Sequence, residues 1–228
     1  MVNASRFAQG MTFDEYLRFI ASPANLAREG SAAPRRDWSD FLRQAYDAAR
    51  IPPAHTEAWR WLVAQPGGPA KVLALSEEWS SDCRRDIPVL ARLADTAGIE
   101  LRIFTRDGQT MGRAPFPQPD SPNADLMAEF LNRRDGETFQ SIPIVAFYSK
   151  DLQLLYRYTE FPAVYRKDRI RTAQNRPAPG ETEAAGQARG LRSFAEMLAS
   201  PFHEVWRSAA LDEWTANLYE RLLVGSLA

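Results

Sequence analysis

The sequence has one cysteine, Cys83, and two histidines among 228 residues. A single cysteine excludes an intrachain disulfide, and so few sulfur and imidazole ligands argue against a metal site built from cysteine and histidine. We expect neither a metal ion nor another cofactor. Apolar runs are also short, because the longest candidates, 72–75 and 142–148, are far below the ~20 residues that cross a bilayer. No membrane partner is therefore expected.

Charge of one sign is not in excess either. The 28 basic and 29 acidic side chains leave a formal net charge of −1, which gives no general reason to expect nucleic acid as a partner. Residues 1–10 contain one basic residue and no apolar stretch of the kind found in secretion signals, so a cytoplasmic location is expected. The hydrophobic share of 45% is that of an ordinary globular protein.

Both ends of the chain have helical spacing. Apolar residues recur three or four positions apart in 13–20, 38–49 and 58–63, with Thr12 placed to cap the first segment and Pro52 following the second. The spacing returns beyond Phe161, where prolines and glycines in 176–186 indicate a linker. These patterns predict an N-terminal helical arm over 1–69 and a C-terminal helical extension over 162–228.

Residues 70–161 have a different pattern. The apolar run 71–75 predicts a strand, 83–97 a helix that ends at Gly98, and 99–104 a second strand, which together make a parallel β-α-β unit. Asn123 is placed to cap a further helix, and the apolar segments 142–148 and 152–158 are too close in the chain to be anything but antiparallel neighbours. The sequence therefore predicts an α/β fold.

Two segments of this region resemble the thioredoxin family: 71–88, which reads KVLALSEEWSSDCRRDIP, and 141–147, which reads SIPIVAF. The resemblance is greatest to a divergent branch with W-C-G-D-C in place of W-C-G-P-C. Trp79 matches the tryptophan, Asp82 the aspartate, Cys83 the second cysteine, and Pro143, preceded by Ile142, the family's cis-proline. The resemblance implies a thioredoxin-like fold, a β-α-β-α-β-β-α core with a central mixed sheet over 70–161.

The family's first, nucleophilic cysteine is replaced by Ser80. In the family that cysteine attacks a disulfide as a thiolate and the second cysteine resolves the mixed disulfide, which a serine cannot replace. The degenerate motif Ser80-Ser81-Asp82-Cys83 therefore implies a protein without dithiol–disulfide reductase activity. The first hypothesis is a binding or single-thiol protein in redox homeostasis, in which the motif and the Ile142–Pro143 segment form a groove for a protein or peptide.

The alternative hypothesis is an enzyme that uses Cys83, oriented by Ser80, as a peroxidase or as a reductase dependent on a small thiol such as glutathione. Ser80-x-x-Cys83 is similar to the Thr-x-x-Cys of peroxiredoxins, although Ser76 stands where they have a proline. The start of a helix and the neighbours Arg84 and Arg85 would lower the pKa of the thiol, whereas burial would make it inert. Both readings of Cys83 stay open at this point.

Three other features have plainer interpretations. The proline-rich loop 106–122 leaves a parallel strand at the same sheet edge as Trp79, so we expect it near the motif. The basic run 166–176 favours a solvated helix face over a nucleic-acid patch. Glu77 and Glu78 are expected to cap a helix or lie at the surface.

Overall fold

A computed structural model describes residues 2–31, 34–113 and 115–225. Its internal contacts divide the chain into two compact units, residues 1–160 with 214–228 and residues 161–213. The residues expected as an N-terminal arm therefore belong to the same unit as the central sheet. The last part of the chain also belongs to that unit, from Trp214 onward.

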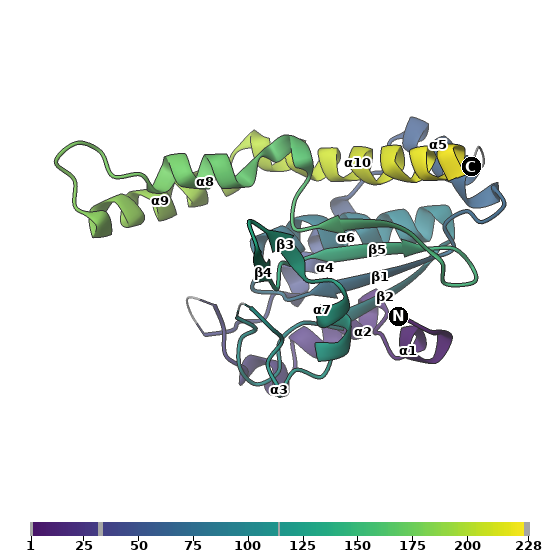
Figure 1. Ribbon diagram of the computed structural model, residues 1–228, viewed down its shortest axis with the longest axis horizontal. Coiled ribbons are helices and arrows are strands. Elements are labelled where there is room, and N and C mark those ends of the chain that lie inside the picture. The colour runs from purple at the N-terminus through teal and green to yellow at the C-terminus, as the bar shows by residue number, and fades with distance from the viewer. Residues whose placement is uncertain (1, 32–33, 114, 226–228) are drawn as a thin grey trace. The chain divides into compact units, whose positions relative to one another are not determined.

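The first unit is built around a mixed sheet of four strands in the order β2-β1-β5-β6. Its central strands are apolar and buried on both faces, as expected for a sheet covered by helices. β1 runs parallel to β2, and β5 pairs antiparallel with both β1 and β6. Figure 1 shows these strands side by side. The strands are β1 (Lys71–Ser76), β2 (Glu100–Thr105), β5 (Ile144–Tyr148) and β6 (Leu154–Thr159).

The α6 helix joins β1 to β2 and contacts both strands. It spans Ser81–Ala97 and ends at Gly98, whose φ of 71° is the left-handed conformation that glycine adopts without strain. The predicted β-α-β unit is therefore present. The other helices of this region are α1 (Ala4–Ala8), α2 (Phe13–Ile20), α3 (Pro23–Leu26), α4 (Ser39–Ala48), α5 (Pro53–Ala64) and α7 (Ala124–Glu129).

The ends of the chain contribute to the core of the first unit. Thr12 caps α2 with the reciprocal hydrogen bonds of a capping box, and Leu17 and Ile20 on that helix are buried. From the C-terminal end, Trp214 is fully buried and its ring lies 6.1 Å from Phe147 and 5.6 Å from Tyr158. These contacts extend the apolar core beyond the thioredoxin-like region.

Two local features differ from the sequence analysis. The short hairpin of β3 (Asn132–Arg134) and β4 (Glu137–Phe139) was not expected, although it turns at Asp135-Gly136, a dipeptide that favours such turns. The expected cap at the start of α7 is wrong. The Asn123 side chain instead donates a hydrogen bond to the carbonyl of Thr105, which fixes the end of the loop 106–122.

The second unit is helical. Gly186, expected in a linker, lies inside α9. It has no side chain, which lets α9 approach Pro177 closely. A ring of Tyr165 stacks on Trp206 with centroids 3.7 Å apart. The elements are η1 (Ala163–Tyr165), α8 (Lys167–Asn175), α9 (Glu183–Leu198) and the start of α10 (Pro201–Gly225), whose last part belongs to the first unit.

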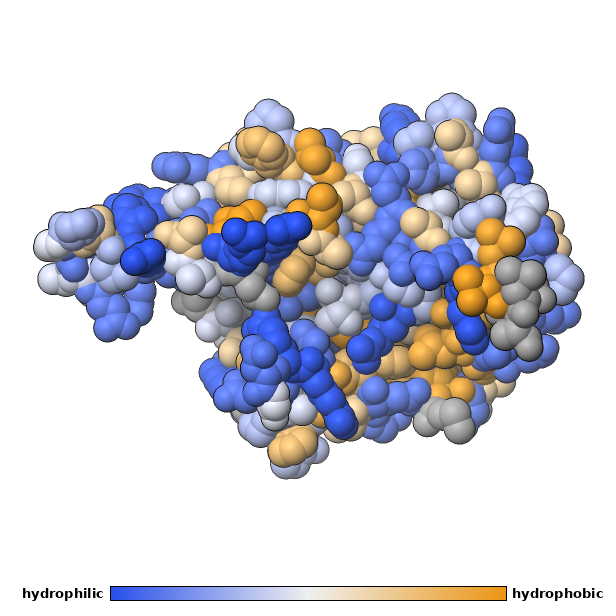
Figure 2. Space-filling model, turned by 45° about the horizontal axis from the view of Figure 1, so that its top comes forward, coloured by the Kyte–Doolittle hydropathy of each residue, from blue (hydrophilic) through white to orange (hydrophobic). Residues whose placement is uncertain are grey.

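The surface gives no sign of a membrane helix. Among the residues that the structure describes, no helix combines the length and the apolar character that a bilayer crossing requires. The face in Figure 2 is largely hydrophilic, and its hydrophobic residues lie in several separate areas.

Candidate functional site

The segment Ser80-Ser81-Asp82-Cys83, the motif, lies where β1 leads into α6. β1 ends at Ser76, and Ser80 is the N-cap of α6, with the extended backbone that this position requires. The hydroxyl oxygen of Ser80 accepts a hydrogen bond from the backbone N–H of Cys83, 3.4 Å away. Ser80 therefore stabilises the start of a helix.

The lone thiol is buried. Cys83 is 1% exposed and lies against the side chains of Ser76 and Ser80 and the backbone of Glu77. Burial raises the pKa of the thiol to about 12, because a thiolate is poorly solvated there and the hydrogen bonds from these neighbours offset only part of that cost. The structure thus places Cys83 in an environment that favours the neutral thiol.

The proline segment lies beside the motif. The register that pairs Leu75 with Ile144 brings Pro143 opposite Ser76, the residue that also contacts Cys83. The peptide bond between Ile142 and Pro143 is cis. The structure therefore brings together the two segments that carry the resemblance.

Most of the predicted site is covered. Trp79 and Ser81 are half-buried and are the parts of the site that reach the surface. The other predicted site residues are buried: Ser80, Asp82, Cys83, Ile142 and Pro143.

An ion-pair network lies directly behind Trp79. Arg35 bridges three carboxylates, Glu77 at 2.6 Å, Glu78 at 2.8 Å and Asp107 at 2.8 Å, with its side chain fully buried. Arg28 adds a second contact to Glu77 at 2.9 Å. The expected surface or capping role of Glu77 and Glu78 is therefore wrong. Acidic residues usually lie at the surface, which is why that role was expected. These two are instead buried, where they pair with arginines from the N-terminal segment.

Asp107 links this network to the motif. One of its carboxylate oxygens accepts a hydrogen bond from the indole N–H of Trp79 at 3.0 Å, and the other accepts from Arg106 Nε at 2.7 Å. The Arg106 guanidinium also lies over the Trp79 ring, 5.1 Å from its centroid. The loop 106–122 therefore starts beside Trp79, as expected, and holds its indole ring.

A second buried network lies on α6. Arg85 contacts Asp82 and Asp86, each at 2.7 Å, and the Tyr158 hydroxyl donates to Asp86 at 2.8 Å. Burial raises the pKa of Asp86 although Arg85 opposes the change. Arg85 was expected to stabilise a thiolate at Cys83, but its hydrogen bonds go to these carboxylates.

Arg84 takes part in neither network. Its Nη1 donates to the backbone carbonyls of Glu78 and Trp79 at 2.8 and 2.7 Å, and its guanidinium lies 3.9 Å from the centroid of the Trp38 ring. The guanidinium of Arg36 lies 3.7 Å from that ring. Two guanidinium groups at stacking distance cannot share one face, so Trp38 lies between them.

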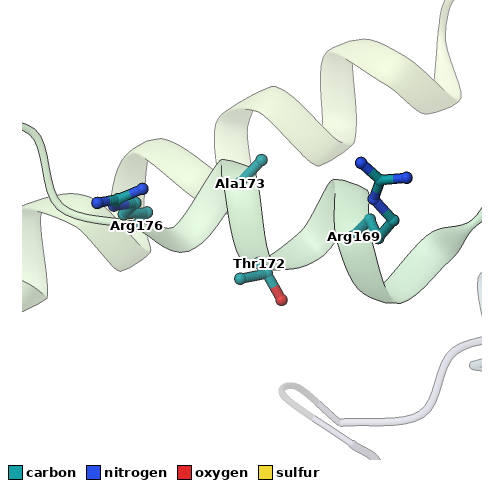
Figure 3. A pocket seen from close by; sticks show the side chains of 4 residues that line it. All are labelled: Arg169, Thr172, Ala173 and Arg176. Carbon is teal, nitrogen blue, oxygen red and sulfur yellow. The ribbon is translucent and has the colours of Figure 1, made fainter.

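A separate hollow of about 380 Å³ lies on α8, in the second unit. Its lining residues come from α8 and its C-cap, with two short side chains between two arginines along the helix, as Figure 3 shows. The lining residues are Arg169, Thr172, Ala173 and Arg176. No cluster of side chains suited to a metal ion is present in the described part of the chain.

Comparison with known proteins agrees with this geometry. A sequence profile described as thioredoxin matches residues 39–173, more than half of the chain. The chain therefore belongs to the thioredoxin family. The profile takes in the motif, the α6 helix and the cis-proline segment, whereas Arg28, Arg35 and Trp38 lie before its first matched residue. No curated protein matches the chain.

Two solved structures are similar to this thioredoxin-family chain. One is a protein of unknown function from Pseudomonas aeruginosa, 16% identical, with a TM-score of 0.50 and all of both chains covered. The other is an HIV epitope-scaffold, 14% identical, with a TM-score of 0.49 and 100% of this chain and 99% of that chain covered. At these identities the likeness to the Pseudomonas protein shows the fold alone.

Sequence reasoning did not find the charged residues that surround the motif. Arg28, Arg35 and Asp107 carry no local pattern that marks them, because they meet Glu77 only through the fold. The one available signal was the pair Glu77-Glu78 directly after a fully apolar strand. Carboxylates that follow a buried strand need cationic or hydrogen-bonding partners.

Proposed function

We propose that this chain is a thioredoxin-family protein that carries out no dithiol–disulfide exchange and acts by binding a protein or peptide segment. The observation that carries the proposal is the state of the two motif positions. Ser80 caps α6 through its hydroxyl, and Cys83 is a buried thiol. Neither position supplies an exposed thiolate.

The chemistry of exchange supports this reading. In the family's cycle a thiolate attacks a disulfide sulfur and forms a mixed disulfide, and a second thiol then displaces the first. The Ser80 oxygen cannot form the mixed disulfide. With a pKa of about 12, on the order of one Cys83 thiol in 10⁵ is ionised at pH 7. A cycle through Cys83 alone thus lacks both an accessible sulfur and a charged one.

Features next to the motif suit binding. Among the described residues, the backbone N–H and carbonyl of Ile142 have no hydrogen-bond partner, whereas the carbonyl of Pro143 accepts from Glu160 at 2.7 Å. An extended peptide pairs with backbone groups of this kind where they are left without partners. Trp79 is half-buried nearby, and its indole N–H is fixed by Asp107. An aromatic ring held in place contributes contact area at little entropic cost.

The alternative of a single-thiol peroxidase or glutathione-dependent reductase has less support. Both reactions require the Cys83 thiolate to meet a substrate in solution, and the sulfur is covered. The hydroxyl that would orient a peroxide, that of Ser80, already accepts the Cys83 N–H.

The decisive experiment compares insulin reduction by the wild type, Ser80→Cys and Ser81→Cys. We expect the wild type to add nothing to the rate with dithiothreitol alone. Ser80→Cys should form an internal disulfide with Cys83 and gain reductase activity. Ser81→Cys is the matched control, because it adds a thiol at a spacing that cannot close a disulfide across the helix start. Turnover by the wild type refutes the proposal.

A second assay separates binding from thiol chemistry. Peroxide consumption and glutathione-dependent disulfide reduction are measured for the wild type and Cys83→Ser. We expect the wild type to show neither activity above that of the variant, and peptide binding to be equal in the two proteins. Activity that disappears in Cys83→Ser would favour the alternative of a single-thiol peroxidase or reductase.

A further inference from the structure

We infer that Arg36, Trp38, Phe41 and Arg84 form a docking surface for an acidic segment of a protein partner. We call these four residues the arginine–tryptophan surface. The inference rests on the proposed binding function and names the chemistry of the partner. It is carried by the charges around the motif and by the stacking of Arg36 and Arg84 on the Trp38 ring.

Most acids around the motif are already neutralised. Every acid that the two buried networks contain is within salt-bridge distance of Arg28, Arg35, Arg85 or Arg106. These acids are Glu77, Glu78, Asp82, Asp86 and Asp107. These five acids face four arginines, so the networks keep one negative charge, and the charges of Glu78 and Asp82 partly balance that of Arg84.

Arg36 and Arg84 are the arginines beside Trp38, and neither forms a salt bridge with a described residue. Within the described ranges, no carboxylate approaches either guanidinium to 4.0 Å. Asp37 is adjacent to Arg36 in the chain, but its carboxylate accepts the backbone N–H of Ser39 at 2.8 Å. Burial lowers the pKa of Arg84 and the charge of Arg36 lowers it further, whereas the charges of Glu78 and Asp82 oppose this change. An anion bound at Arg36 would reduce the repulsion between these two like charges.

The stacking on Trp38 leaves N–H donors of the Arg36 guanidinium free to bind an anion. A guanidinium that stacks on an aromatic ring uses its flat face, while its N–H donors point outward in the plane. Arg36 is exposed, so its donors are open to solvent. A carboxylate can accept two of them side by side, which is the preferred geometry of an arginine–carboxylate pair. Stacking on Trp38 also reduces the side-chain freedom that binding would otherwise remove.

An apolar contact completes the surface. Phe41 is 42% exposed and its ring packs edge-on against Trp38 with centroids 5.5 Å apart. Arg84 connects this surface to the motif through its hydrogen bonds to the Glu78 and Trp79 carbonyls. A segment that combines acidic and apolar side chains thus fits the surface and can continue toward Trp79.

Charge favours a protein segment over nucleic acid. Nucleic-acid affinity comes from neutralising several phosphates at once, and this surface offers two guanidinium groups in a chain of formal charge −1. One or two carboxylates match that number.

The test uses fluorescence anisotropy with two labelled peptides of about twelve residues, one repeating Gly-Glu-Phe and one repeating Gly-Gln-Phe. We expect the wild type to bind the glutamate peptide about tenfold more tightly than the glutamine peptide. Binding of the glutamate peptide should weaken when the salt concentration is raised, because salt screens exposed charges.

Variants locate the binding. Arg36→Gln should weaken binding of the glutamate peptide about fivefold and leave the glutamine peptide unchanged. Arg36→Lys should fall between, since it keeps the charge but loses the planar donors. Arg157→Gln, which removes an exposed arginine of β6, is the matched control and should have no effect.

Three results overturn the inference: equal binding of the two peptides, equal loss in Arg36→Gln and Arg157→Gln, or tighter Arg36-dependent binding of a double-stranded oligonucleotide. The outcome is separable from that of the proposed function. If insulin is reduced by the wild type, the proposed function fails whatever the peptides do. If the wild type is inactive and the glutamate peptide has no advantage, only the docking surface is wrong.

Discussion

The Oγ atom of Ser80 accepts the backbone N–H of Cys83 across 3.4 Å at the start of α6. This contact gives Ser80 a structural role as the cap of α6. A helix start leaves several backbone N–H groups without partners, and a serine at the N-cap satisfies one of them. The Ser80 hydroxyl therefore contributes to the stability of α6.

The cap leads to a first prediction. Ser80→Ala should lower the free energy of unfolding by about 1 kcal/mol, because the Cys83 N–H loses its partner. Ser81→Ala, one position later, is the control and should change stability by less than about 0.5 kcal/mol. Urea denaturation of both variants gives the values. Equal losses would mean that the hydroxyl of Ser80 does not cap the helix.

Burial of Cys83 predicts slow alkylation. At neutral pH the native protein should react with iodoacetamide on the order of 10³ times more slowly than the denatured protein, since its pKa is about 12 and that of a free thiol is about 8.5. Intact mass against time measures both rates. Fast labelling of native protein with a midpoint below pH 8.5 would show an activated thiol and revive the enzymatic alternative.

The same pKa shift predicts how stability depends on pH. Because the pKa of Cys83 is higher in the folded than in the unfolded protein, the contribution of this residue to the free energy of unfolding is fully present below about pH 9 and is lost as pH rises toward 12. The free energy of unfolding then falls by at most about 1.4 kcal/mol per pH unit. Cys83→Ala has no thiol to ionise, so the difference in stability between this variant and the wild type should shrink between about pH 9 and 10. A deficit that stays constant over that interval would contradict the shift.

The sequence was sufficient to predict the core of the fold. The run 71–75, the helix closed by Gly98 and the antiparallel pair beginning at Ile142 are local signals, and each produced the expected element. Such signals work because burial of a strand and the left-handed turn of a glycine depend on nearby residues only. The order of elements then restricted the fold to few topologies.

The surroundings of the site could not be predicted in the same way. Arg35 and Glu77 are 42 positions apart, and nothing near either residue indicates that they meet. The exposure of Cys83 also depends on side chains from separate elements, so the sequence left its reactivity open. The charge of Arg36 and Arg84 became informative only once the partners of the neighbouring acids were known.

The ion-pair network behind Trp79 predicts a large effect from one residue. Arg35→Gln leaves three buried carboxylates without their shared cation and should cost about 3–5 kcal/mol of unfolding free energy. Arg43→Gln, which removes an exposed partner of Asp14, is the control and should cost less than about 1 kcal/mol.

The pH dependence of Arg35→Gln distinguishes lost charge from lost packing. Burial already raises the pKa of Glu77, and removal of Arg35 raises it further. A carboxyl group with a raised folded pKa destabilises the fold increasingly as pH rises. The deficit of the variant should therefore be larger at pH 8 than at pH 5, and a deficit independent of pH would indicate lost packing alone.

Two buried tyrosines on neighbouring strands should respond oppositely to loss of the hydroxyl. Tyr158 donates to Asp86 at 2.8 Å, so Tyr158→Phe leaves a buried carboxylate with one partner fewer and should cost about 1–3 kcal/mol. The buried hydroxyl of Tyr148 has no hydrogen-bond partner in the described part of the chain, so its desolvation is uncompensated. Tyr148→Phe should leave stability unchanged or raise it by up to about 1 kcal/mol. Thermal unfolding of both variants compares them in one experiment, and a similar loss in each would show that Tyr148 also has a partner in solution.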